Sequence, residues 1–156
     1  MKKWMLFSLI LAAIPALSFG GFGGEDVGKL RPVQVVYIKS HDGGVELRTD
    51  TEDWGVGETV DHAVENMKET SLGSIFLDTA DYLLIEPGAE TWLPQLKRYL
   101  RPSCSLCYAS GPMDLKQTGQ FLQLHEPNLT LSRYEAGERN FSKLISNEGR
   151  LCLVQP

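Results

Sequence analysis

The sequence predicts an α/β (α+β) domain with a mixed β-sheet, an N-terminal antiparallel hairpin and three to four helices packed on the sheet. Two strand patterns separated by a glycine turn predict the hairpin. After the hairpin, helical periodicities alternate with short apolar runs, which is typical of helices packed on a sheet. The chain has 156 residues, of which 42% are hydrophobic and 22% charged, as in an ordinary globular domain.

The first half of the domain is predicted from residue patterning. Residues 33–38 are rich in β-branched side chains and predict a strand that is apolar on both faces. Residues 41–44 predict a turn, and the alternation over 45–49 predicts the return strand. Residues 50–57 are expected to form a loop. Apolar residues at helical spacing over 60–67 predict a helix, with Thr59 or Gly57 as its N-cap.

The second half continues the alternation of strands and helices. The predicted strands cover 74–77, 82–85, 105–109, 129–131 and 151–154. The predicted helices begin near 91, near 115 and near 141, and the first of them accommodates Pro94 in its first turn.

The N-terminus is predicted to direct export. Lys2 and Lys3 precede an apolar run, and small residues at Ser18 and Gly20 favour cleavage before Gly21. We therefore expect a signal peptide over 1–20, a glycine-rich linker over 21–29 and one α/β domain over 30–156. No cysteine follows the apolar run, so lipidation is not expected. The expected location is extracytoplasmic, either secreted or membrane-associated in a bacterial envelope.

The charge balance bears on possible partners. The chain carries 15 Lys and Arg against 20 Asp and Glu, for a net charge of −5. It has no basic run, whereas nucleic-acid binding depends on clustered cations. The sequence therefore predicts no nucleic-acid partner, and no motif in it indicates a cofactor.

The three cysteines allow a disulfide or a thiol site. Cys104 and Cys107 form a CxxC, but the motif runs into a predicted strand rather than a helix N-terminus. On a strand, an offset of three places the two side chains on opposite faces. In an oxidising compartment we expect one structural disulfide, with Cys107–Cys152 preferred over Cys104–Cys152. Buried free thiols are the alternative.

Asp78, Asp81 and His62 are the weaker candidates for acid–base chemistry. Asp78 and Asp81 bracket a predicted turn, where aspartate is common for structural reasons. His62 lies beside Asp61 on the polar side of a predicted helix. No ligand spacing or nucleophile motif accompanies any of the three histidines. The sequence therefore predicts neither a catalytic set nor a metal site.

The loop over 50–57 raises two further possibilities. Asp50, Glu52 and Asp53 could bind calcium, but their pattern lacks the length of an EF-hand loop, so a solvated loop is expected. Gly55-Val56-Gly57 before a helix is similar to part of a phosphate-binding loop, although the full GxGxxG is missing. Trp54 is expected to pack over the core.

A family resemblance covers residues 55–122. It includes the helix opening at 57–64, two apolar strands joined by a small polar step over 75–86, a helix running into Arg101, and a strand that reaches Gly111. This order resembles the N-terminal domain of the Ger(x)C family, the C subunits of spore germinant receptors in endospore-forming bacteria. The resemblance implies a non-catalytic, extracytoplasmic subunit that works with a polytopic membrane protein. Family members are lipoproteins with two further domains, and we expect this protein to differ from them in both respects.

These observations together predict an exported, non-catalytic accessory or binding module at the outer face of the cytoplasmic membrane, related to sporulation or germination. One alternative is a small secreted enzyme that uses Asp78, Asp81 or a histidine. Another is a thiol–disulfide protein that uses Cys104 and Cys107.

Overall fold

The computed structural model describes residues 30–111, 113–147 and 149–156. The predicted signal peptide over 1–20 and the linker over 21–29 lie outside the described residues. Within the described part of the chain, no helix has the length and apolar character required to cross a membrane.

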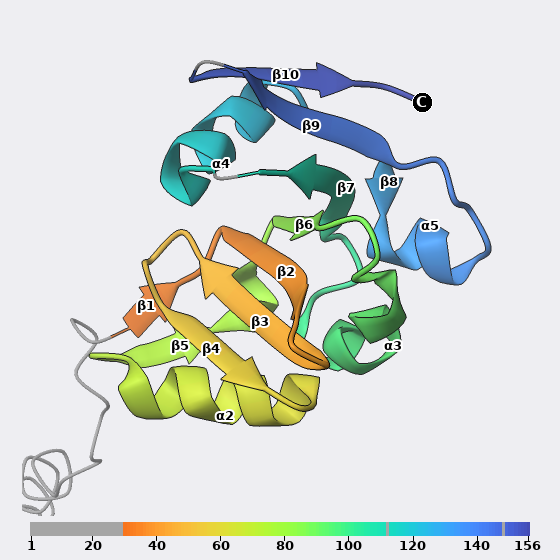
Figure 1. Cartoon of the computed structure of the whole chain (residues 1–156). Coiled ribbons are helices and arrows are strands. Elements are labelled where there is room, and N and C mark those ends of the chain that lie inside the picture. Colours follow the sequence, from red (N-terminus) through yellow and green to blue (C-terminus); the bar gives the residue numbers. More distant parts are fainter. Residues whose placement is uncertain (1–29, 112, 148) are drawn as a thin grey trace, which may run out of the picture.

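A mixed sheet of eight strands forms the centre of the fold, as predicted (Figure 1). The strand order across the sheet is β10-β9-β7-β6-β2-β3-β4, and the short strand β8 pairs with β7 outside this order. The strands are β2 (Val35–His41), β3 (Gly44–Thr49), β4 (Trp54–Gly57), β6 (Tyr82–Ile85), β7 (Ser105–Ser110), β8 (Leu129–Thr130), β9 (Ser142–Asn147) and β10 (Arg150–Val154).

Parallel strands occupy the middle of the sheet and antiparallel hairpins form its two sides. β2, β6, β7 and β9 pair in parallel, whereas β3 and β4 extend one side and β10 the other in antiparallel pairing. All four residues of β6 are buried, which explains why its sequence is apolar throughout. Asp42 and Gly43 have positive φ angles of 40° and 84°, so the predicted turn between β2 and β3 is confirmed.

Helices cover both faces of the sheet. α2 (Val60–Thr70), α3 (Leu93–Leu96) and α5 (Leu131–Glu135) contribute to one hydrophobic core, and α4 (Leu115–Leu124) closes a second core on the opposite face. Among the described residues there are also three 3₁₀ helices, η2 (Leu77–Thr79), η3 (Glu90–Trp92) and η4 (Lys97–Tyr99). A separate parallel pair joins β1 (Leu30–Pro32) to β5 (Ser74–Phe76).

The α2 helix confirms the prediction from periodicity. Thr59 is its N-cap, because the Thr59 hydroxyl accepts a hydrogen bond from the His62 N–H. The buried positions are Val60, Ala63, Val64 and Met67, which is the predicted apolar face.

Three predicted elements differ from the structure. Residues 54–57 form strand β4 rather than a loop, because they pair with β3. Residues 142–147 form strand β9 rather than a helix, because they pair with both β7 and β10. The helix expected from 91 to 100 is divided into η3, α3 and η4.

Candidate functional site

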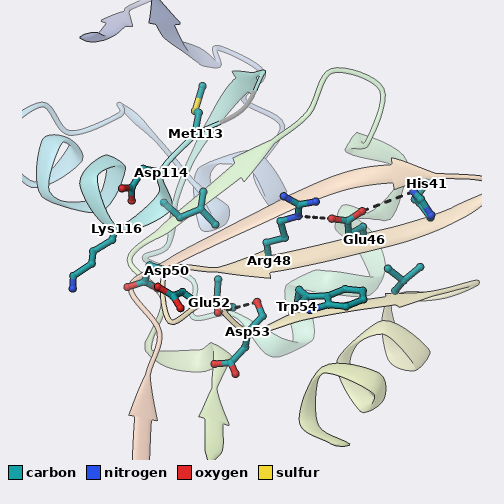
Figure 2. A pocket seen from close by; sticks show the side chains of 13 residues that line it. His41, Glu46, Arg48, Asp50, Glu52, Asp53, Trp54, Met113, Asp114 and Lys116 are labelled. Carbon is teal, nitrogen blue, oxygen red and sulfur yellow. Dashed lines mark hydrogen bonds and ion pairs between the residues drawn. The ribbon is translucent and has the colours of Figure 1, made fainter. Parts of the chain in front are cut away.

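A groove of about 610 Å³ lies above the β3–β4 hairpin, on the face of the sheet opposite α2 (Figure 2). Trp54 and Val56 of β4 form one side. Met113 and Leu115, at the start of α4, form the other. Arg48 of β3 lies between the two sides. The groove therefore combines apolar walls with a charged floor.

Trp54 is the most exposed aromatic group in this groove, with 56% of its surface accessible. Successive side chains of a strand point to opposite faces. Gly55 and Gly57 face α2, where the backbone of Ala63 approaches closely, so Trp54 and Val56 face the groove. The expectation that Trp54 packs over the core is therefore wrong. The Gly55-Val56-Gly57 pattern is a helix-packing feature of β4 and not a phosphate-binding loop.

Glu46 is the centre of a charged network at the groove floor. Its carboxylate is 3.0 Å from Lys39 Nζ, pairs with Arg48 Nε and lies 3.8 Å from His41 Nδ1. Glu46 is 5% exposed because these longer side chains cover it. Burial alone would raise the pKa of Glu46, but the hydrogen bonds from Lys39 and Arg48 prevail and lower it. Glu46 is therefore ionised at neutral pH.

The substitution Glu46→Gln tests this network. A lowered folded-state pKa means that Glu46 stabilises the fold above about pH 4.5, and that this stabilisation is lost as pH falls through the folded-state pKa. We expect Glu46→Gln to cost about 1 kcal/mol at pH 7, since the partners are partly exposed to solvent.

Urea unfolding from pH 7 to pH 3 measures this effect. The difference between the wild type and Glu46→Gln should shrink as the pH falls. A difference that stays constant, or that grows in acid, contradicts the assignment of Glu46 as an ionised partner of Lys39 and Arg48.

The acidic loop between β3 and β4 is held by structural contacts. Asp50 Oδ1 accepts hydrogen bonds from the N–H groups of Gln34 and Val35, both at 3.0 Å. Asp53 pairs with Arg31 at 3.1 Å and accepts a hydrogen bond from the Thr51 hydroxyl at 2.6 Å. These two carboxylates brace the loop, so the expectation of a merely solvated loop is wrong for them.

Metal binding at this loop finds no support in the geometry. No group of three or more His, Cys, Asp or Glu side chains arranged to hold a metal ion occurs in the described ranges. Glu52 differs from its neighbours, because it is exposed and has a positive φ of 66°.

The structure does not bring the predicted acid–base candidates into one cleft. Asp81 pairs with Arg101, just before β6. Asp78 is exposed in η2, and His62 is exposed on α2. None of these three residues lines the groove.

The cysteines lie on separate parts of the sheet. Cys104 belongs to the core under α2 and α3, whereas Cys107 belongs to the core under α4, as expected for opposite faces of a strand. Burial raises the pKa of each thiol to about 12, so neither is a reactive thiolate at neutral pH.

The prediction of a Cys107–Cys152 disulfide is wrong. All three cysteines are free, and β9 lies between the β7 strand of Cys107 and the β10 strand of Cys152. The prediction assumed that these two strands were neighbours. Cys104–Cys152 is likewise not formed, and Cys152 is exposed.

Sequence reasoning missed the groove because its walls come from separate segments. Trp54 lies on β4, whereas Met113 and Leu115 lie about 60 residues later in the chain. The alternation Trp-Gly-Val-Gly was the available signal for this strand, because it has a period of two residues, with large side chains on one face and glycines on the other. Recognising β4 would have placed Trp54 and Val56 on one surface.

Comparison of this chain with protein-family models, with curated proteins and with solved structures gave no match. The resemblance to the Ger(x)C family therefore stays a prediction.

Proposed function

We propose that this protein is an exported, non-catalytic binding module at the outer face of the cytoplasmic membrane, and that its groove holds an extended segment of a membrane-protein partner. The observation that carries the proposal is the exposed Trp54 indole in a groove with further apolar side chains. Exposed aromatic groups beside apolar and charged neighbours are typical anchors of protein interfaces.

The charged groups of the groove support binding more than catalysis. Glu46 is ionised and paired with Lys39 and Arg48. Asp50 accepts hydrogen bonds from the backbone N–H groups of Gln34 and Val35. Asp114 is the N-cap of α4, because Oδ1 accepts a hydrogen bond from the Gln117 N–H at 3.0 Å. The hydrogen bonds that these carboxylates accept give them structural roles, whereas a general acid or base has to be within hydrogen-bond reach of the reacting group of a substrate.

The charge of the lining favours a basic segment. Five carboxylates line the groove, against the permanent cations Arg48 and Lys116. Glu46 is paired with Lys39 and Arg48, and Asp53 with Arg31. Asp50, Glu52 and Asp114 therefore carry the negative charge that a partner would meet. Asp50 and Glu52 are in the loop after β3 and Asp114 is at the start of α4, on the left and toward the centre of Figure 2, whereas Glu46 is on the right. A partner with a lysine or arginine next to an apolar residue would place its cation toward these carboxylates and its apolar side chain on Trp54.

Export and the membrane location rest on the sequence. The charged, apolar and small-residue order of positions 1–20 supports secretion. The acidic domain is repelled by anionic lipid, which favours a protein partner over direct lipid binding. The link to sporulation or germination rests on the family resemblance alone.

Trp54→Ala should abolish most of the groove's affinity. As probes we choose two hexapeptides, one with lysine alternating with leucine and a second with glutamate in place of lysine, both titrated by calorimetry. We expect the lysine peptide to bind more tightly than the glutamate peptide, and Trp54→Ala to weaken its binding at least about tenfold, which corresponds to 1.4 kcal/mol.

Leu72→Ala is the matched control. Leu72 is 93% exposed and does not line the groove, so its loss should leave peptide binding unchanged. Equal binding of the lysine peptide to the wild type and to Trp54→Ala would rule out the groove as the recognition surface. Tighter binding of the glutamate peptide would rule out a basic partner segment.

A further inference from the structure

We propose that a small side pocket of the groove binds an aliphatic side chain of the partner segment, and that the groove therefore selects an aliphatic residue two positions away from a lysine or arginine. This inference rests on the proposed function, because it assigns the residue pattern that the same groove recognises. Three observations carry it, namely the size and lining of the side pocket, the strand register, and the distribution of charge along the groove.

The side pocket adjoins the groove on its α4 side. It has a volume of about 40 Å³, and it shares Arg48, Met113 and Leu115 with the lining of the groove. Tyr37 of β2 and Gly111 complete its lining. Met113 and Leu115 pack against the same hydrophobic core as Tyr37, so most of the surface around the pocket is apolar. A cavity of this size holds roughly three water-sized groups, which is the size of an isopropyl group.

The hydroxyl group of Tyr37 already has a partner. It donates a hydrogen bond to Glu86 Oε1 at 3.2 Å. Burial, followed by the negative charge of Glu86, raises the pKa of Tyr37 to about 12, so the phenol is neutral at pH 7. Because its proton is bonded to Glu86, an aliphatic group that enters the side pocket deprives Tyr37 of no hydrogen bond.

Strand register places the side pocket relative to Trp54. Tyr37, Arg48 and Trp54 lie directly opposite one another on β2, β3 and β4, so their side chains form one row across the groove face. Figure 2 shows Met113 and Trp54 on opposite sides of Arg48. An extended segment that runs along β3 directs successive side chains to opposite sides. One residue of the segment therefore contacts Trp54, and the next residue faces the α4 side.

The carboxylates that attract a cation lie farther along β3 on the α4 side. Asp50 follows Arg48 by two residues, which is about 7 Å along a strand, and Asp114 is between Met113 and Leu115 in the sequence. An extended segment has the same rise per residue. When its aliphatic residue fills the side pocket, the residue two positions away reaches these carboxylates, and the residue between them contacts Trp54.

The charge distribution determines at which end of the groove the cation binds. The row of residues on the other side of Arg48 contains Lys39, Glu46 and Val56. The Glu46 carboxylate is 3.0 Å from Lys39 Nζ and also pairs with Arg48, so its charge is already balanced. A further cation at this end would lie near Lys39 and be repelled by it. The cation of the partner is therefore expected at the Asp50 end.

Two peptides of identical composition test the spacing in two-dimensional NMR titrations. In acetyl-Ser-Leu-Leu-Lys-Ser-amide, one leucine is two residues from the lysine. In acetyl-Leu-Ser-Leu-Lys-Ser-amide, that leucine is moved by one position, so it faces the β4 side. Each peptide is also made in reversed order, since either chain direction satisfies the spacing. We expect the better peptide of the first pattern to bind at least about fivefold tighter than either peptide of the second pattern, because only the first fills the side pocket.

Met113→Ala tests whether the side pocket selects by size. Phenylalanine in place of the leucine two residues from the lysine should weaken binding to the wild type at least about fivefold, because its ring is larger than an isopropyl group. Met113→Ala widens the pocket and should abolish or reverse this preference. Leu124→Ala is the matched control, since Leu124 is also on α4, is 82% exposed and lines neither cavity. The ratio of the two peptide affinities is compared, and this ratio does not depend on the fraction of folded protein.

The outcomes distinguish this inference from the proposed function. Equal binding of both patterns, with Trp54→Ala weakening both, would show that the groove binds a segment without this spacing, and would overturn the inference alone. Binding of neither pattern above the level seen with Trp54→Ala would overturn the proposed function and the inference together. A preference for leucine over phenylalanine that persists in Met113→Ala would overturn the assignment of the side pocket.

Discussion

Gly55→Ala should destabilise the fold by about 3 kcal/mol, the largest effect we expect from adding a single methyl group to this chain. A Cβ at Gly55 would lie 2.1 Å from the Ala63 carbonyl oxygen and 2.8 Å from the Met67 backbone nitrogen. Both atoms belong to the backbone of α2, so they cannot move aside as a flexible side chain would. Relief requires α2 to separate from β4, which disrupts the packing of a buried helix face.

Gly119→Ala is the matched control for this prediction. Its Cβ would be 2.8 Å from Gln34 Oε1, the end of a flexible side chain, and 2.9 Å from Val35 Cγ2, a methyl group of a buried side chain that has to shift slightly. Alanine also gains about 1 kcal/mol of helix propensity within α4. We therefore expect a net change of less than about 1 kcal/mol.

Urea unfolding followed by far-UV circular dichroism measures both variants. Equal losses in Gly55→Ala and Gly119→Ala would contradict the assignment of Gly55 as the contact point between β4 and α2. Gly55→Ala should also weaken groove binding, because movement of β4 displaces Trp54.

Asp50→Ala should cost about 2–4 kcal/mol. Asp50 Oδ1 accepts hydrogen bonds from the N–H groups of Gln34 and Val35, and Val35 is fully buried. Removing the carboxylate leaves these donors without their acceptor at the start of β2, and each orphaned donor incurs a desolvation penalty. The Asp50 N–H also donates to the Val35 carbonyl at 3.2 Å, so the loop and β2 are joined in both directions.

Asp50→Asn separates the hydrogen bonds from the charge. The asparagine side-chain oxygen can accept the same two bonds, so we expect less than half of the loss seen in Asp50→Ala. Asp50→Asn also removes one negative charge from the groove lining and should weaken binding of the lysine peptide while the fold remains intact. Equal destabilisation by the two substitutions would show that the charge, and not the bonding to β2, stabilises this loop.

The groove shows why local patterning located some features and missed others. The Glu46 and Arg48 side chains alternate along β3 with buried neighbours, so their shared face followed from the predicted strand. To place Trp54 in the groove, one has to know that residues 54–57 form β4, and they are a strand only because they pair with β3. To place Met113 and Leu115 in the groove, one also has to know that α4 packs on the face of the sheet opposite α2.

The sequence by itself determined the elements whose patterning is local. The hairpin of β2 and β3, the apolar parallel strands β6 and β7, and the capped helix α2 all follow from periods of two or 3.6 residues. The opposite faces of Cys104 and Cys107 follow from the same alternation.

Only the tertiary structure decided the elements whose identity depends on distant partners. Phe141, Leu144 and Ile145 lie at helical spacing, but hydrogen bonding of residues 142–147 to β7 and β10 makes this segment a strand. The separation of Cys107 from Cys152 likewise depends on strand order, because β9 is inserted between β7 and β10. Strand pairing satisfies backbone hydrogen bonds between segments that are far apart in the sequence, and a local residue pattern does not specify which segments will pair.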